Sequence, residues 1–201
     1  MLLRDEIQPS FMFEEVVRGR RCVPEVLTAV IELAVSLARE GREGRKVGAL
    51  FVVGDEENVL KKSKPMILDP LGKHPLDAKD IRDAAVRETV KELAKLDGAF
   101  IISGDGYVLS AARYIYANCE GINLPLGLGS RHMAAASISK ETDAVAIVVS
   151  KSGIVRMFDG GELVCEIMPK AWLSSAKTLI SGEYEEILKD DLVIFSKKPK
   201  K

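Results

Sequence analysis

The sequence predicts an α/β (α+β) protein in which helices flank a mixed central β-sheet. Short, apolar, β-branched runs at 47–54 and 144–149 are typical of buried strands. Between residues 24 and 41, apolar side chains recur at three- and four-residue steps, which predicts an amphipathic helix. Elsewhere glycine turns join one strand directly to the next, and this mixed order favours a layered domain with a mixed sheet.

In the N-terminal half we expect a helix, a strand, a loop and a second helix, at 24–41, 47–54, 55–76 and 80–96. Pro24 fits the first position of a helix, and Gly41 is a typical stop signal. Prolines and a glycine spread through the third segment mark it as mainly loop. Asp80 is the expected N-cap of the second helix.

In the C-terminal half hairpins alternate with helices. Strands are expected at 99–103, 107–115, 144–149, 154–158, 162–167 and 192–195. The segment Gly104–Gly106 predicts the turn of the first hairpin. Ser130 is expected to cap an alanine-rich helix that ends near Lys140. Two more helices are expected, at 172–180 and after Gly182.

Composition excludes several classes of protein. The 201 residues carry 29 Lys and Arg against 30 Asp and Glu, and this balance argues against a protein that coats nucleic acid through its charge. No run approaches the roughly 18 apolar residues of a membrane span, and the first residues include acids where a secretory signal has an apolar run. Cys22, Cys119 and Cys165 lack metal-ligand spacing and predict reduced thiols in a cytoplasmic protein.

The length fits one ordinary domain, which we expect at 46–168. A helical extension is expected before it, at 1–45. The segment 169–201 is expected to add helices, a short strand and the solvated basic tail Lys197–Lys201.

The first candidate motif is Asp97-Gly98-Ala99, an acid at a helix-to-strand junction. Asp-Gly is common turn chemistry, and a simple turn is one interpretation. An acid there can instead hold a divalent metal, whose oxygen ligands are often one or two carboxylates plus substrate phosphates.

The second motif is Ser130-Arg131-His132, which two glycines, Gly127 and Gly129, precede. Glycine lets a ligand approach the backbone, and the free N–H groups at a helix start favour an anion. Arg131 adds donors that match phosphate oxygens, and His132 is a further donor or acceptor. The alternative is an ordinary capped helix, although cations in a first turn oppose the helix dipole.

The third motif ends a strand at 149–153 with two hydroxyls and a lysine, Ser150, Lys151 and Ser152. On its own this segment is typical of a hairpin tip. The order of the three motifs along the chain is more specific than any one of them.

In this order the motifs resemble the diadenylate cyclase domain, the module that makes cyclic di-AMP. Lys46–Gly54 is similar to the opening strand of that family, and Glu92–Ala99 carries its signature Asp-Gly-Ala. Leu128–Ala135 is close to the second signature, Gly-Thr-Arg-His-Arg. Shorter matches follow at 138–144 and 147–150.

The resemblance implies a diadenylate-cyclase-like fold that condenses two ATP into cyclic di-AMP and releases two pyrophosphates. Asp97 would bind Mg²⁺ or Mn²⁺ near the attacking hydroxyl and, with Arg131 and His132, would be catalytic. Tyr114 and Ile115 match positions that flank the adenine. The implied ATP-binding residues are Gly98, Ala99, Tyr114, Ile115, Gly129, Ser130, Arg131, His132 and Ser150.

The resemblance also implies a homo-oligomer, because each domain holds one ATP and two protomers must face each other. No nucleic acid and no membrane span is expected. Two positions depart from the signature: Ser130 keeps the hydroxyl of the usual threonine, and Met133 replaces an arginine. The lost arginine leaves open a catalytically weak sensor that binds ATP or cyclic di-AMP, and a nucleotide-dependent phosphotransferase is a third interpretation.

Overall fold

The structure, a computed structural model, describes residues 19–41, 45–175 and 177–198. Its α-helices are α2 (Pro24–Glu40), α3 (Glu56–Lys61), α4 (Ala84–Leu93) and α5 (Ser130–Glu141). Its strands are β1 (Ala49–Val53), β2 (Ser63–Pro65), β3 (Ala99–Ile102), β4 (Val108–Ile115), β5 (Val145–Val149), β6 (Val155–Asp159), β7 (Glu162–Pro169), β8 (Tyr184–Lys189) and β9 (Leu192–Lys197).

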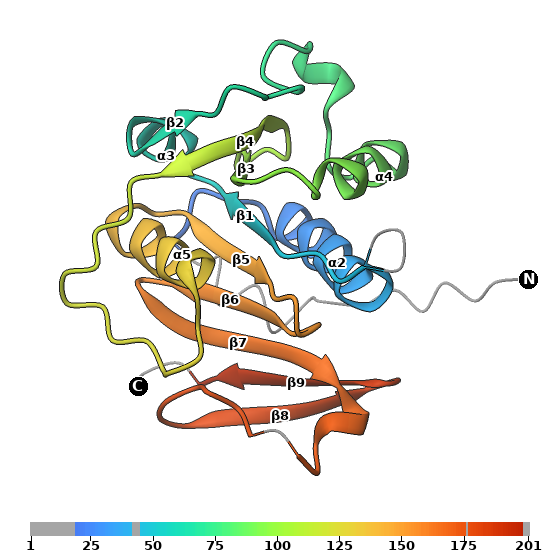
Figure 1. Ribbon diagram of the computed structural model, residues 1–201, viewed down its shortest axis with the longest axis vertical. Coiled ribbons are helices and arrows are strands. Elements are labelled where there is room, and N and C mark those ends of the chain that lie inside the picture. The colour runs from blue at the N-terminus through green and yellow to red at the C-terminus, as the bar shows by residue number, and fades with distance from the viewer. Residues whose placement is uncertain (1–18, 42–44, 176, 199–201) are drawn as a thin grey trace, which may run out of the picture.

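All of these strands join one sheet in the order β2-β4-β3-β1-β5-β6-β7-β9-β8 (Figure 1). β1 pairs with β3 in parallel, and every other pairing is antiparallel. The predicted mixed sheet is therefore confirmed. None of the helices within the described residues is long and apolar enough to cross a membrane.

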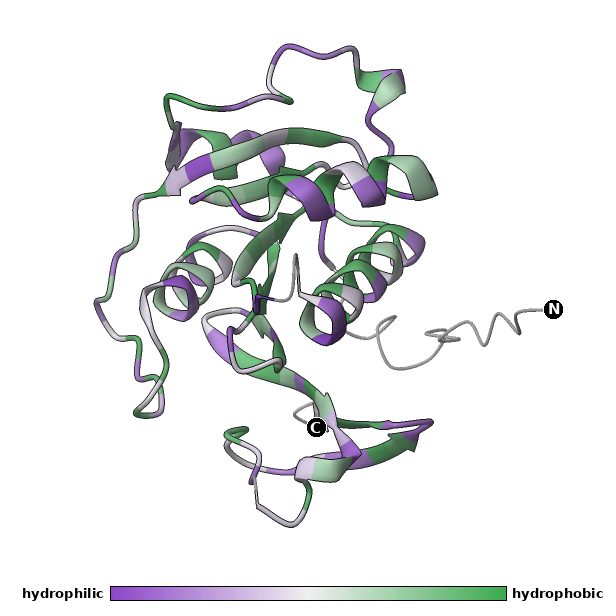
Figure 2. Cartoon of the chain, turned by 45° about the vertical axis from the view of Figure 1, so that its right-hand side comes forward, coloured by the Kyte–Doolittle hydropathy of each residue, from purple (hydrophilic) through white to green (hydrophobic). Residues whose placement is uncertain are grey.

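Helices cover both faces of the sheet. Alternate residues of β1 divide between two cores: Phe51 packs with α2, and Val52 packs with α5. Ten residues of α2 are buried, which explains the apolar periodicity of that segment. Figure 2 shows the central strands coloured as hydrophobic, while hydrophilic residues gather on loops and outer helix surfaces.

The segment 55–76 is more ordered than the expected loop. It contains α3, whose Val59 is fully buried, and the short strand β2. β2 lies at the edge of the sheet, where the missing N–H of Pro65 leaves no ladder partner unsatisfied. The sequence did not indicate α3 or β2, whereas residues 66–75 form the expected loop.

The predicted cap of the next helix was also wrong. α4 begins after Asp83, whose side chain accepts a hydrogen bond of 2.7 Å from the Ala85 amide. Asp80 instead forms an isolated bridge with Tyr107, and its carboxylate accepts hydrogen bonds from Arg82. Tertiary pairing therefore holds Asp80 outside the helix.

The C-terminal segment forms a hairpin in place of the two predicted helices. After a 3₁₀ turn at Lys170–Trp172, β8 and β9 pair with each other, and β9 continues the sheet beside β7. The Tyr184 ring packs edge-on against Phe195, with centroids 5.7 Å apart. The predicted strand 192–195 is confirmed and extends to Lys197, which pairs with Glu162 instead of starting a solvated tail.

The flanking segments thus contribute to the same core and sheet as residues 46–168. Residues 1–18 of the expected N-terminal extension and 199–201 of the basic tail lie outside the described residues. The division of the chain at 45 and 168 stays a prediction.

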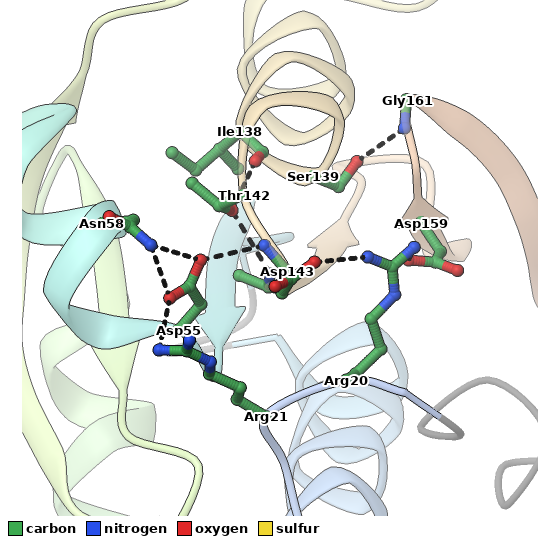
Figure 3. Close-up of polar contacts among 11 residues, drawn as sticks. Arg20, Arg21, Asp55, Asn58, Ile138, Ser139, Thr142, Asp143, Asp159 and Gly161 are labelled. Carbon is green, nitrogen blue, oxygen red and sulfur yellow. Dashed lines mark hydrogen bonds and ion pairs between the residues drawn. The ribbon is translucent and has the colours of Figure 1, made fainter.

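A polar cluster ties the far end of α5 to the segment before α2 (Figure 3). The buried Asp55 carboxylate accepts hydrogen bonds from the Asn58 amide and from the backbone N–H of Asp143, at 2.9 Å each. Arg20 joins Asp143 to Asp159, at 3.3 and 2.7 Å. These contacts fix the C-terminal end of α5, and its N-terminal end lies at the opposite end of the central strands.

Candidate functional site

The register of the sheet gathers the predicted motifs at one end. Leu50 of β1 lies beside Ala99 of the parallel β3, and Ala49 lies beside Val149 of the antiparallel β5. The residues just before β1 and β3 therefore meet those just after β5. The Asp97-Gly98 motif and the Ser150 turn, which are far apart in the sequence, become neighbours in this way.

The first turn of α5 adds the second motif to this end. Nη2 of Arg131 lies 3.2 Å from Oδ1 of Asp97. The Asp97 side chain is 84% exposed, so this ion pair contributes little to stability. The exposed carboxylate is accessible to a ligand. The two residues that carry most of the implied chemistry are thus in direct contact.

Gly48 lies beneath Arg131, and it belongs to none of the three predicted motifs. A Cβ atom at Gly48 would lie 3.1 Å from Nη1 of Arg131 and 3.5 Å from Cγ of Lys151. The missing side chain lets both cationic residues cross the start of β1. A glycine inside an apolar strand pattern was the available signal for this close approach.

Gly98 joins β3 closely to β4. Its φ is +106°, and a Cβ there would lie 2.8 Å from the backbone nitrogen of Arg113 and 3.0 Å from Sδ of Met66. Only glycine fits both the left-handed backbone and the contact. This packing accounts for Gly98 structurally, and its contact with a nucleotide stays a prediction, as does that of the buried Ala99.

The structure separates the two residues expected to flank the adenine. Tyr114 is 55% exposed and its ring lies 5.6 Å from Nζ of Lys64 and 6.1 Å from the Tyr116 ring. Ile115 points to the other face of β4 and is buried in the core. Of these two residues, Tyr114 is the one whose ring is exposed for stacking on a base.

The start of α5 differs from the expected cap. Gly129 occupies the N-cap, its carbonyl accepts hydrogen bonds from the amides of His132 and Met133, and Ser130 is the first helical residue. No atom lies within 4 Å of a Cβ built on Gly127 or Gly129, so the approach to the helix start is open. Ser130 is exposed beside this opening.

His132 points into the protein, away from the exposed surface that Arg131 and Asp97 share. Its ring packs edge-on against Phe158, with ring centroids 6.2 Å apart, and its Nε2 lies 3.4 Å from Nη1 of Arg156. Burial, with the charge of Arg156, lowers the pKa of His132 from 6.5 to about 4. The imidazole is therefore neutral at pH 7, and its Nδ1 has no hydrogen-bond partner. Direct phosphate binding by His132 stays a prediction.

Ser150 lies in the predicted hairpin tip. Its backbone N–H donates to the Ile154 carbonyl, and its hydroxyl lies 2.8 Å from that of Ser152. Two hydroxyls thus sit beside Lys151 at the end of β5.

The donor set limits how a metal can bind. Within residues 19–41, 45–175 and 177–198 there is no group of three or more His, Cys, Asp or Glu side chains that could hold a metal ion. The exposed Asp97 carboxylate supplies one hard oxygen ligand. This fits Mg²⁺ or Mn²⁺ that is held jointly with substrate phosphates, since Mg²⁺ is commonly bound by one or two carboxylates plus phosphate oxygens.

The chain is similar to known proteins. A Methanocaldococcus jannaschii protein named diadenylate cyclase is 50% identical over 146 residues, 72% of this chain and 46% of the relative. A Haloferax volcanii protein of the same name is 44% identical over 153 residues, 76% of this chain and 56% of the relative. The chain thus spans about half the length of these relatives.

A solved structure has the same fold. It is described as a hypothetical membrane spanning protein from Bacillus cereus, and it superposes with a TM-score of 0.55 at 20% identity over 75% of this chain and 68% of its own. Residues 36–163, which include Asp97, Arg131 and Ser150, match the DAC family, described as DisA bacterial checkpoint controller nucleotide-binding. The chain therefore belongs to the DAC family.

Proposed function

We propose that this protein is a diadenylate cyclase that condenses two ATP into cyclic di-AMP and releases two pyrophosphates. The observation that carries the proposal is the 3.2 Å contact between Asp97 and Arg131 within the segment that matches the DAC family. It joins an exposed metal-ligating carboxylate to a phosphate-binding guanidinium at a helix N-terminus. A site with one exposed carboxylate suits a divalent metal whose remaining ligands include phosphate oxygens of the substrate.

In each of two equivalent steps, the 3′-hydroxyl oxygen of one ATP attacks the α-phosphorus of the other. A new P–O bond forms, the bond from that phosphorus to the bridging oxygen of the β-phosphate breaks, and pyrophosphate leaves. The proton of the hydroxyl passes to solvent or to a nearby base. Mg²⁺ or Mn²⁺ bound at Asp97 would neutralise charge on the phosphate oxygens.

The residues of this chain position the substrate. Arg131 and the free amides at the start of α5 bind phosphate oxygens, with Ser130 beside them. Ser150 contacts the terminal phosphates, and Lys151 supplies positive charge near Gly48. The exposed Tyr114 ring stacks on the adenine, an interaction worth about 1–3 kcal/mol per base.

Ring closure requires a second copy of the chain. One protomer presents one such surface, so two protomers meet face to face in a homo-oligomer, each contributing one ATP. Exposed apolar side chains flank the proposed contact in the loop after β2, where Ile67 and Leu68 extend into solvent. We place the enzyme in the cytoplasm, where ATP is available and the three free cysteine thiols stay reduced.

Met133 favours a second function, a sensor that binds ATP or cyclic di-AMP without efficient catalysis. Because His132 is neutral at pH 7, Arg131 is the one cation among residues 130–133. A site with fewer cations stabilises a leaving pyrophosphate less well, while it can still hold a nucleotide.

One experiment distinguishes these functions. The protein is incubated with ATP and Mn²⁺, and the products are identified by mass spectrometry. Cyclic di-AMP with pyrophosphate supports the cyclase. Unchanged ATP together with metal-dependent ATP binding supports the sensor and contradicts the cyclase. ADP as the product would indicate phosphotransfer.

A further inference from the structure

A buried chain of polar groups connects the start of α5 to the segment after the 3₁₀ turn. Nε2 of His132 lies 3.4 Å from Nη1 of Arg156, and Nε of Arg156 donates to Oε1 of Glu166 at 2.8 Å. Oε2 of Glu166 accepts from the Thr178 hydroxyl and from the Leu179 amide, at 2.6 Å each. Four separate segments of the chain therefore meet along one line of contacts.

This chain of contacts lies in the interior. Glu166 is fully buried, and Arg156 and His132 are 6% and 7% exposed. Moving an ion pair out of water is unfavourable by several kcal/mol per ion, so a buried pair is weak evidence for stability and is better explained by the geometry it enforces. The Thr178 and Leu179 donors complete the bonding of the carboxylate and keep the pair in one arrangement.

Arg156 determines how His132 is held. A guanidinium can only donate hydrogen bonds, so Nε2 of the neutral imidazole is the acceptor and its proton lies on Nδ1. Nδ1 has no partner and the ring edge packs on Phe158, so the contact with Arg156 is the polar contact that orients the ring. His132 directly follows Arg131, and a shift of its ring would move the first turn of α5.

We propose that Glu166 is a positioning residue that acts through Arg156 and His132 to hold the first turn of α5, and with it Arg131, in place for the phosphates. Thr178 and the Leu179 amide hold Glu166 in turn. The inference rests on the proposed function for its catalytic consequence. It extends the support of the site beyond residue 163, where the DAC family match ends.

The test compares two substitutions of the half-buried Thr178. Thr178→Val keeps the shape and removes the hydroxyl, while Thr178→Ser keeps the hydroxyl. In the full chain, NMR reports the amides of residues 130–133 and the ring nitrogens of His132. The chain has only two histidines, so His74→Gln assigns the ring signals. We expect Thr178→Val and Glu166→Gln to shift both sets of signals, and Thr178→Ser to leave them near their wild-type positions.

Kinetics supply the second readout. We expect Thr178→Val to raise the KM for ATP at least about fivefold with a smaller change in kcat. The reason is that a displaced Arg131 would bind the phosphates of ATP less tightly. Thr178→Ser should restore the wild-type KM. Glu162→Gln is the matched control, because it neutralises an exposed glutamate on the same strand and should leave KM unchanged.

The outcomes separate the two proposals. Unshifted signals from residues 130–133 and His132 in both Thr178→Val and Glu166→Gln would overturn the positioning role, as would a lower melting temperature with unchanged signals and KM. Shifted signals in a protein that makes no cyclic di-AMP would support the positioning role and contradict the cyclase.

Discussion

Nη2 of Arg131 lies 3.2 Å from Oδ1 of Asp97, although 34 positions separate the two residues in the chain. The parallel pairing of β1 with β3 and the packing of α5 on the sheet bring them together. The contact joins the two signatures of the family in one exposed site, and it makes Asp97 the first residue to test.

Asp97→Asn should abolish cyclic di-AMP formation, because the amide replaces the carboxylate that we propose as the metal ligand. The side chain is 84% exposed, so the free energy of unfolding should change by less than about 1 kcal/mol. Product analysis and urea unfolding measure the two effects. Wild-type turnover in this variant would show that Asp97 is not the metal ligand.

Gly98→Ala should destabilise the fold by about 1–3 kcal/mol, since the new Cβ would lie 2.8 Å from the Arg113 nitrogen at a φ of +106°. Gly127→Ala is the control, because Gly127 has a φ of +93° and no atom within 4 Å of its Cβ position. Urea unfolding should therefore show the larger loss for Gly98→Ala. Equal losses would mean that backbone conformation alone, and not the contact with β4, requires glycine at 98.

The protein should become less stable as the pH falls from about 6.5 to about 4, because its folded state holds His132 neutral. The pKa of His132 is lowered in the folded state to about 4 by burial, and by Arg156 and Arg131 against the opposing effect of Glu166. In this range the unfolded chain binds a proton that the folded chain does not, so acid favours unfolding. Between pH 7 and 4.5, wild type should lose about 2 kcal/mol more than His132→Gln.

Urea unfolding at the two pH values measures this difference. His74→Gln is the control, because it replaces the other histidine of the chain, which lies in an exposed loop. The same loss in wild type and in His132→Gln would mean that His132 is not held neutral.

Met133→Arg should increase the rate of cyclic di-AMP formation, because it adds a cation to the first turn of α5 near Arg131. Met133 is only partly buried, so an arginine can reach solvent there without leaving a buried charge. Initial rates at saturating ATP and Mn²⁺ measure the effect. An unchanged or lower rate would show that Met133 does not limit this protein.

The central part of the fold could be predicted from the sequence because local patterns agree with their tertiary setting. α2 combines Pro24 at its start with a continuous apolar stripe, and β1 and β5 are apolar runs buried on both faces. The two signatures predict Asp97 and Arg131 as site residues, and the structure brings their side chains into contact. For these segments pattern, propensity and packing favour the same structure.

The C-terminal hairpin could not be predicted in the same way. Tyr184–Lys189 is rich in residues that favour helices, including two glutamates, a leucine and a lysine. Its strand conformation depends on pairing with β9, a contact that no local pattern reveals. Asp80 was misassigned for a similar reason, since its bridge to Tyr107 is also tertiary.

The inward orientation of His132 could not be predicted from the sequence. Consecutive helical residues point about 100° apart, so His132 turns inward when Arg131 faces Asp97. Which of the two faces the core depends on how α5 packs. The polar partner of His132 is Arg156 of β6. Arg156 is bound in turn by Glu166 of β7, and Glu166 by Thr178, and no spacing in the sequence indicates that these residues meet.

The most direct test of the proposed activity uses equal amounts of unlabelled ATP and ATP with ¹⁵N-labelled adenine, incubated with the protein and Mn²⁺. If each product joins two ATP molecules, mass spectrometry should show cyclic di-AMP in three masses, with the mixed species twice as abundant as either pure one, and pyrophosphate beside it. Recovery of both forms of ATP unchanged, or of ADP without any mixed species, would contradict the assignment as a diadenylate cyclase.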